Sequence, residues 1–434
     1  MSSDSNIPMS FTRRILAEKA GKDYAAPGEL CSCSLDLAMG NDITVPPALH
    51  LFEKHFTDGQ VSDNCLYVFC MDHFVPCKDI KSAQNVKECR EFAKKHDNIL
   101  FYDVGNSGIE HCFLPENGFI SPGDAVIGAD SHTCTYGALG AFSTGVGSTD
   151  LAAALRTGKC WFRIPEAIGF RLTGKLPEDC SGKDLILYII GMIGVDGALY
   201  RSMEFYGEGV ASLSIDDRFT VCNMAIEAGG KNGLFTVDKK TVEYLASSGA
   251  SLNGGFCPTE ENVNEGAYER IIEIDLNKLR PMIAMPHKPS NVVPVNEMNK
   301  TQIDQVVIGS CTNGRISDLR IAAEVLKGRK VAPYVRCIII PGTQKIYKQA
   351  VNEGLVDIFI DAGAAVSTPT CGPCLGGHMG VLADNERCVS TTNRNFVGRM
   401  GHITSEVYLA SPLTAARAAV RGYVGNSGKE GDPV

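Results

Sequence analysis

The sequence predicts an α/β fold divided into several domains. Short apolar runs alternate along the chain with segments of helical periodicity, and this alternation is typical of domains built on parallel sheets. The chain has 434 residues, and at roughly 150 residues per domain this length suggests about three domains. Because ligands bind at the carboxyl ends of the strands in such sheets, we expect functional residues directly after the apolar runs.

The elements follow from local patterns taken in chain order. A helix is expected from about Thr12, after a polar N-terminus. Buried strands are predicted where apolar runs end at turn residues, near residues 65, 124, 304 and 336. Another strand is expected to begin at about residue 166. The segments 82–96 and 318–328 have helical spacing and charged outer faces, which predicts surface helices.

Two positions suggest domain boundaries. The strand at about residue 166 would open a second α/β domain, so that the first covers 1–165 and the second covers 166–285. The Pro- and Asn-rich stretch 286–302 is typical of a linker. A third α/β domain then covers 303–424, and the polar tail 425–434 is expected to be disordered.

Charge and hydropathy exclude several classes of protein. The net charge of −9 argues against nucleic-acid and membrane-surface partners, which usually require a basic face. No apolar run approaches the roughly 20 residues of a membrane span, and the N-terminus has no secretory apolar core. We therefore expect a cytoplasmic protein. In a reducing compartment its 17 cysteines do not indicate a disulfide framework. Cysteines in apolar surroundings are expected to be small buried hydrophobes, namely Cys65, Cys70, Cys89, Cys160, Cys337 and Cys388.

Three other cysteines stand in Gly-rich loops. Cys311 follows a predicted strand in VVIGSCTNGR, and Cys371 and Cys374 form a C-x-x-C in STPTCGPCLGGHMG. Four interpretations are open: structural cysteines, a thioredoxin-like redox pair, structural zinc and an iron–sulfur cluster. A redox pair requires a helix that starts at the first cysteine, and LGGHMG is a poor helix start. Structural zinc normally takes four protein ligands. Three thiolates on a [4Fe–4S] cluster would leave one iron to act as a Lewis acid.

Three of the nine histidines occur in motifs with carboxylates. A carboxylate bound to one imidazole nitrogen fixes the tautomer and raises the basicity of the other nitrogen. Such pairs suit general acid–base catalysis. The candidate pairs are Asp72 with His73, His111 with Asp130, and His132 with Glu227. Surface or structural positions are expected for His50, His55, His96 and His287. The Gly-rich run GALGAFSTGVGSTD is followed by no nucleotide-binding pattern.

SCTNGR and TCGPCLGGHMG resemble the cluster-binding segments of the aconitase superfamily. The resemblance continues in the family's order through MGNDITVP, CMDHFVPCKDIKSA, GIEHCFLPENG, GADSHTCTYGALGAFSTGVGSTDLA, FTVCNMAIEAGGKNG and STTNRNFVGRMGH. It spans nearly the whole chain. It implies three α/β domains of the aconitase type around a central cluster-binding cleft. It also implies a hydro-lyase with a [4Fe–4S] cluster on Cys311, Cys371 and Cys374, in which one iron has no protein ligand.

The resemblance further implies how the substrate is bound. The three His–carboxylate pairs would surround the substrate hydroxyl. Arg394 and Arg399 would bind substrate carboxylates, since a guanidinium matches a carboxylate in two hydrogen bonds. Ser131 resembles a substrate-contacting serine. Asn41 stands where aconitase has a substrate-contacting glutamine, and this difference argues against citrate. The family's asparagines near the cluster correspond to Asn223 and Asn393.

Full-length aconitases carry a fourth, swivelling domain, for which the sequence has no matching segment. That domain supplies a further arginine and the serine that abstracts the substrate proton. The resemblance therefore implies a heteromer with a small subunit that carries the swivel domain and the catalytic serine. The substrate would be a small dicarboxylate or hydroxy acid, most similar to the substituted malates. Alternatives from other classes are an RNA-binding regulator, which the acidic charge disfavours, and a redox protein built on CGPC.

Overall fold

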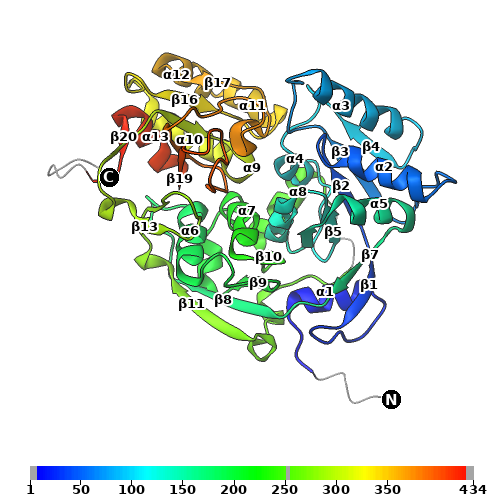
Figure 1. Ribbon diagram of the computed structural model, residues 1–434. Helices are drawn as coiled ribbons and strands as arrows, with labels where there is room; N and C mark the ends of the chain where they lie inside the picture. Colours follow the sequence, from blue (N-terminus) through cyan, green and yellow to red (C-terminus); the bar gives the residue numbers. More distant parts are fainter. Residues whose placement is uncertain (1–6, 251–254, 427–434) are drawn as a thin grey trace.

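The computed structural model describes residues 7–250 and 255–426. Three groups of elements follow one another along the chain (Figure 1): a blue and cyan group at the right, a green group below, and a yellow-to-red group at the upper left. Each group contains one sheet whose neighbouring strands are all or mostly parallel. This confirms the predicted α/β class.

The first group is built on a five-stranded parallel sheet with the order β4-β3-β2-β5-β6. Its strands are β2 (Leu37–Gly40), β3 (Leu66–Cys70), β4 (Ile99–Tyr102), β5 (Ala125–Gly128) and β6 (Phe142–Gly145). Its helices are α1 (Phe11–Lys19), α2 (Val45–His55), α3 (Ile80–Ala93), α4 (Glu110–Glu116) and α5 (Ser148–Thr157). An antiparallel ribbon joins β1 (Leu30–Ser34) to β7 (Lys159–Arg163). The strands predicted near residues 65 and 124 are therefore present, as are the first helix and the helix over 82–96.

The second group is built on a four-stranded parallel sheet with the order β10-β9-β8-β11. Its strands are β8 (Ala167–Thr173), β9 (Ser202–Tyr206), β10 (Asn232–Phe235) and β11 (Arg270–Asp275), with helices α6 (Gly182–Ile193), α7 (Ile215–Asn223) and α8 (Lys239–Ser248). A 3₁₀ helix of the first group, η2 (Ser131–Leu139), packs against α7 and β10. A Cβ on Gly137 would lie 1.6 Å from the carbonyl oxygen of Gly233, so only glycine allows this approach.

The third group contains a seven-stranded sheet with the order β13-β12-β19-β18-β15-β16-β17. Its strands are β12 (Met282–Ala284), β13 (Val292–Pro294), β15 (Gln305–Ile308), β16 (Arg336–Ile339), β17 (Ala365–Val366), β18 (Arg387–Ser390) and β19 (Glu406–Ala410). Its helices are α9 (Ser310–Asn313), α10 (Ile316–Leu326), α11 (Gln344–Asn352), α12 (Leu355–Ala362) and α13 (Pro412–Arg421). Outside this sheet, β14 (Thr301–Gln302) pairs with β20 (Tyr423–Val424).

The stretch 286–302 is more structured than a plain linker. Its strand β13 pairs antiparallel with β12, which in turn pairs antiparallel with β19 at the edge of the third sheet. The largest buried apolar cluster also runs through all three groups, since it includes Met39, Phe170 and Val307. We keep the domain division as a proposal. The tail 427–434 lies outside the described residues.

Burial of the cysteines follows the expectation for a reduced protein. All 17 are free, and the six expected to be small core residues are buried. Among residues 7–250 and 255–426, no helix combines the length and apolar character that crossing a membrane requires.

Candidate active site

A cavity of about 170 Å³ gathers most of the residues singled out in the sequence. Most of them follow the carboxyl ends of β2, β3, β5, β15 and β18, where parallel sheets present ligand-binding groups. His111 lies on α4 after β4, and Cys371 and Cys374 follow β17. The predicted site residues that line it are Asn41, Asp72, His73, His111, Asp130, Ser131, His132, Cys311, Cys371, Cys374, Arg394 and Arg399. The other three predicted residues do not line the cavity but are hydrogen-bonded to residues that do. They are Asn223 and Asn393, which contact Cys311, and Glu227, which contacts His132.

Cys311 is placed by a sharp turn between β15 and α9. Gly309 has φ 150°, and Ser310 adopts the left-handed φ of 72°. A Cβ on Gly309 would lie 2.5 Å from the carbonyl oxygen of Ile340, so glycine is required there. Cys371 is the N-cap of a single 3₁₀ turn, η9 (Gly372–Leu375), Cys374 lies within that turn, and no α-helix begins at Cys371. The geometry required of a thioredoxin-like pair is therefore absent at this C-x-x-C.

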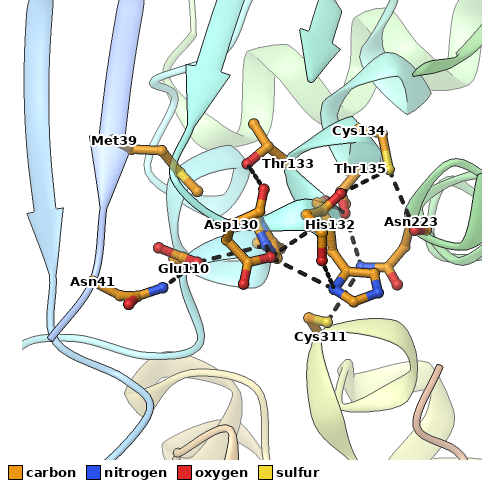
Figure 2. Close-up of polar contacts among 12 residues, drawn as sticks. Met39, Asn41, Glu110, Asp130, His132, Thr133, Cys134, Thr135, Asn223 and Cys311 are labelled. Atoms are coloured by element: carbon orange, nitrogen blue, oxygen red, sulfur yellow. Dashed lines mark hydrogen bonds and ion pairs between the residues drawn. The ribbon is translucent and has the colours of Figure 1, made fainter. Parts of the chain in front are cut away.

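The sulfur atoms of these cysteines face hydrogen-bond donors. The Nδ2 atoms of Asn223 and Asn393 lie 3.2 and 3.4 Å from the Sγ of Cys311, and Figure 2 shows Asn223 directed at that sulfur. Nη2 of Arg399 lies 3.7 Å from the Sγ of Cys374. Hydrogen bonding from Cys371, together with the charge of Arg399, holds the pKa of Cys374 well below its ordinary value. Burial raises the pKa of Cys311, and the hydrogen bond to Cys374 raises that of Cys371. Donors in these positions suit thiolates, which are the form that binds metal.

The three thiols are not grouped as closely as ligands of a single ion. Sulfur ligands of one tetrahedral zinc lie about 3.8 Å apart, because each Zn–S bond is about 2.3 Å long. The groups of ligand atoms that lie within 4.8 Å of one another in the described chain are Asp42–Asp72–His73 and Glu110–His111–Asp130, and the three thiols do not form such a group. The wider set of thiols fits a polynuclear iron–sulfur cluster better than one ion.

The three expected imidazole–carboxylate contacts are all present. Nδ1 of His73 lies 2.5 Å from Oδ1 of Asp72. Nε2 of His111 lies 2.8 Å from Oδ1 of Asp130. On the α7 side, Nε2 of His132 lies 2.9 Å from Oε1 of Glu227. All three imidazoles are buried, so each ring is held in one orientation.

Burial and neighbouring charges shift the pKa values of His73 and His111 in opposite directions. Burial opposes a charge on His73, but the neighbouring Asp72 carboxylate raises the pKa of His73 well above its ordinary value. Burial lowers the pKa of His111, which favours its neutral form. Burial also opposes a charge on Asp130, yet hydrogen bonds from His111 and His132 hold its pKa well below the usual range. The environment of the site therefore favours the cationic form of His73, the neutral form of His111 and the ionised form of Asp130.

The two arginines are partly committed to protein groups. Nε of Arg394 donates to Oε1 of Glu227 at 2.8 Å, which leaves its terminal NH₂ groups for the cavity. Arg399 lies against Cys374. Ser131 places its Oγ 3.5 Å from Nδ1 of His132.

Three buried ionisable residues of the site were not predicted from the sequence. Asp42 accepts the backbone N–H groups of residues 72, 73 and 74 at 2.8 to 3.0 Å and so fixes the loop after β3. Lys183, at the start of α6, donates to the carbonyl oxygens of Thr391 and Thr392 at 2.7 and 2.6 Å. Glu110 lines the cavity beside His111. Only Glu110 had a visible signal, since it precedes a selected histidine in GIEH.

Three convergent thiols and three imidazole–carboxylate pairs in a parallel α/β frame are features of an iron–sulfur hydro-lyase. Residues 15–422 match the profile of the aconitase family (aconitate hydratase), and the chain belongs to that family. Its cysteines are consistent with the family's [4Fe–4S] cluster.

Curated relatives that share one name match nearly the whole chain. The 3-isopropylmalate dehydratase large subunit of Caldicellulosiruptor saccharolyticus is 60% identical over 429 residues, which cover 98% of this chain and 99% of the relative. The protein of the same name from Heliobacterium modesticaldum is 60% identical over 416 residues, covering 96% and 98%. The crystal structure of Thermococcus kodakaraensis aconitase X in its holo-form has a TM-score of 0.49 and 14% identity, over 84% of each chain.

Proposed function

We propose that this chain is the large, cluster-bearing subunit of a 3-isopropylmalate dehydratase. The reaction converts 2-isopropylmalate to 3-isopropylmalate through isopropylmaleate, a step of leucine biosynthesis. The observation that carries the proposal is the convergence of three thiols and three imidazole–carboxylate pairs on one cavity. The 60% identity to relatives of that name, over nearly the whole chain, supports isopropylmalate as the substrate.

Cys311, Cys371 and Cys374 would hold the [4Fe–4S] cluster, with one iron left without a protein ligand. When bound, the cluster supplies a Lewis acid that polarises the carbon–oxygen bond of the substrate. Asn223 and Asn393 would remain hydrogen-bonded to the Cys311 sulfur, and such contacts tune the potential of a cluster.

Proton transfer would be performed by the imidazole–carboxylate pairs. We assign the protonation of the departing hydroxyl to His73, because Asp72 favours its cationic form and both residues line the cavity. Asp130 and His111 would accept and orient that hydroxyl together with Ser131. His132, held by Glu227, would complete the ring of hydrogen bonds around it.

The terminal NH₂ groups of Arg394 and Arg399 would bind substrate carboxylates. The proton on the adjacent carbon would be removed by the serine of a small subunit that carries the swivel domain. We expect that subunit because the relatives are named large subunits and match this chain end to end. Isopropylmalate would then be bound where the two subunits meet.

Other substituted malates are the alternatives within the same chemistry. They are the substrates of 2,3-dimethylmalate dehydratase, of a methylmalate/citraconate hydro-lyase and of homoaconitase. An anaerobic panel with the reconstituted two-subunit enzyme separates them. We expect the highest kcat/KM with 3-isopropylmalate. A higher value for any other acid would replace the proposed substrate, and no turnover of any member would reject the hydro-lyase.

A further inference from the structure

Glu110, the first residue of α4, has an unusual environment in the cavity wall. It is fully buried and lines the cavity. Its backbone N–H donates to Oδ2 of Asp72 at 2.8 Å, which fixes the residue in place. Its Oε1 accepts from Nδ2 of Asn41 at 3.1 Å, whereas its Oε2 contacts no hydrogen-bonding group of the protein. Figure 2 shows Glu110 between Asn41 and Asp130.

Three carboxyl groups meet here, and two of them have an imidazole of their own. Asp72 is bound to His73, and Asp130 is bound to His111. Glu110 has only an amide partner, since Nε2 of His111 lies 3.6 Å away and is already committed to Asp130. A third buried negative charge would be strongly disfavoured. In agreement, burial and the charges of Asp72 and Asp130 raise the pKa of Glu110 well above its ordinary value.

We place the proton of this neutral carboxyl group on Oε2. Oε1 already accepts the amide hydrogen of Asn41, which leaves Oε2, buried in the cavity wall without a protein partner, to carry the O–H. The amide oxygen of Asn41 accepts from the backbone of Ile43 and Thr44 and from the Thr44 hydroxyl. Asn41 is thus held by its own loop and serves as a positioning residue for Glu110.

We propose that Glu110 is a substrate-binding residue whose neutral carboxyl group donates a hydrogen bond to a carboxylate oxygen of the dicarboxylate substrate. A buried O–H without a protein acceptor is costly, and an anionic oxygen gives the strongest hydrogen bond it can form. Glu110 would thereby add a neutral donor to the positive charges of Arg394 and Arg399. This inference rests on the proposed dicarboxylate chemistry.

The test uses the reconstituted two-subunit holoenzyme and two ligands. Isopropylmalate has two carboxylates and a hydroxyl, and isopropylsuccinate has the carboxylates alone and cannot react. Glu110→Ala should raise both the KM for 3-isopropylmalate and the inhibition constant of isopropylsuccinate by about 10- to 100-fold. Glu110→Gln keeps a neutral donor and should change either constant by less than about threefold. Iron content should be unchanged in both variants.

The control is Glu116→Gln at the other end of α4, which should leave both constants unchanged because Glu116 does not line this cavity. An unchanged inhibition constant in Glu110→Ala would overturn the contact to carboxylate. If Glu110→Gln were as impaired as Glu110→Ala, the neutral donor would be rejected. Failure of the proposed substrate is seen separately in the wild-type panel. The same variants would then be measured with the acid that the panel selects and with its saturated, hydroxyl-free analogue.

Discussion

Arg394 links Glu227 to the cavity, and we propose that it also binds a carboxylate of the substrate. Its Nε donates to Glu227, and its terminal groups remain for a carboxylate. We expect Arg394→Lys to lower kcat/KM by about 10- to 100-fold, because an ammonium cannot serve both partners in the same geometry. The visible absorption of the cluster should persist. Arg387→Lys, in an exposed ion pair with Glu406, is the control. Near-normal turnover of Arg394→Lys would remove this arginine from the site.

Cys371 and the exposed Cys77 allow a matched test of cluster binding. Replacing Cys371 by Ser removes a soft thiolate ligand, so the reconstituted protein should lose iron and its broad visible absorption. Cys77→Ser should retain both. Stoichiometric iron in Cys371→Ser, and likewise in Cys311→Ser and Cys374→Ser, would contradict the ligand assignment.

Lys183 predicts a pH dependence of stability. Burial lowers its pKa in the folded protein from 10.5 to about 7. Between these values the unfolded chain binds more protons, so the free energy of unfolding should rise with pH from about 7 to 10. Below pH 7 the lysine is charged in both the folded and the unfolded protein. The cost of burying its charge then lowers the free energy of unfolding by its full amount. Denaturant titrations of cluster-free protein should show this slope in wild type and a smaller one in Lys183→Met. Parallel curves would show that the folded pKa is not depressed.

The cysteines could be predicted from their Gly-rich loops and the Asp72–His73 pair from adjacent residues. The His111–Asp130 and His132–Glu227 pairs span 19 and 95 positions, and their roles were predicted through the resemblance to the aconitase superfamily. Lys183 could not be predicted, since a lysine near a helix start normally faces solvent and its partners lie more than 200 positions away in the sequence. Asp42 was missed for a similar reason: its role is to accept backbone N–H groups, which leave no pattern in a sequence.

At the scale of elements, the N-cap of α10 connects the three groups. Arg315 is buried and donates to the carbonyl oxygens of Cys311 and Thr312 at 3.1 Å and of His111 at 3.3 Å. Its guanidinium also lies 4.4 Å from the Phe219 ring centroid. One side chain therefore ties the cluster loop to α4 and to α7.

We expect Arg315→Met to reduce the free energy of unfolding by about 3–5 kcal/mol, because Asp216, 3.7 Å from Nε, would lose the cation that compensates it. Cluster bleaching in air should also become faster. Arg320→Met on the same helix breaks an ion pair whose arginine is half exposed, and should cost less than about 1 kcal/mol. Equal losses in the two variants, measured by urea unfolding, would show that Arg315 has no special role.

Strands with continuous apolar runs, such as β3, β5, β15 and β16, were predicted because their pattern is local. The edge strand β13 was not, since its Pro- and Asn-rich segment resembles a linker and its strand character depends on pairing with β12. The 3₁₀ conformation of η2 was equally hidden. In this element Gly137 packs closely against Gly233, and such a contact between distant residues cannot be recognised from a local sequence pattern.

At the scale of the whole molecule, we expect this chain alone to be catalytically inert even with its cluster intact. The base would be supplied by the partner, and without it the site would be open to water, which weakens electrostatic stabilisation of the transition state. Addition of the small subunit should restore turnover and slow oxidative bleaching together. Turnover by the isolated chain within about tenfold of the two-subunit enzyme, in an anaerobic hydration assay, would place the base in this chain.

The junction of three sheets at the cluster loops also has a consequence for biogenesis. The N–H of Cys371 is bonded to the carbonyl oxygen of Asp72 at 2.7 Å, and the sulfur of Cys311 is bonded to Asn223, so each ligand loop is fixed by a distant part of the chain. If these loops hold the cluster, we expect iron and sulfide to be retained only after all three parts have docked. Cluster insertion would then be a late step of maturation, and the visible absorption of the reconstituted protein would measure the fraction of chains that have completed their folding.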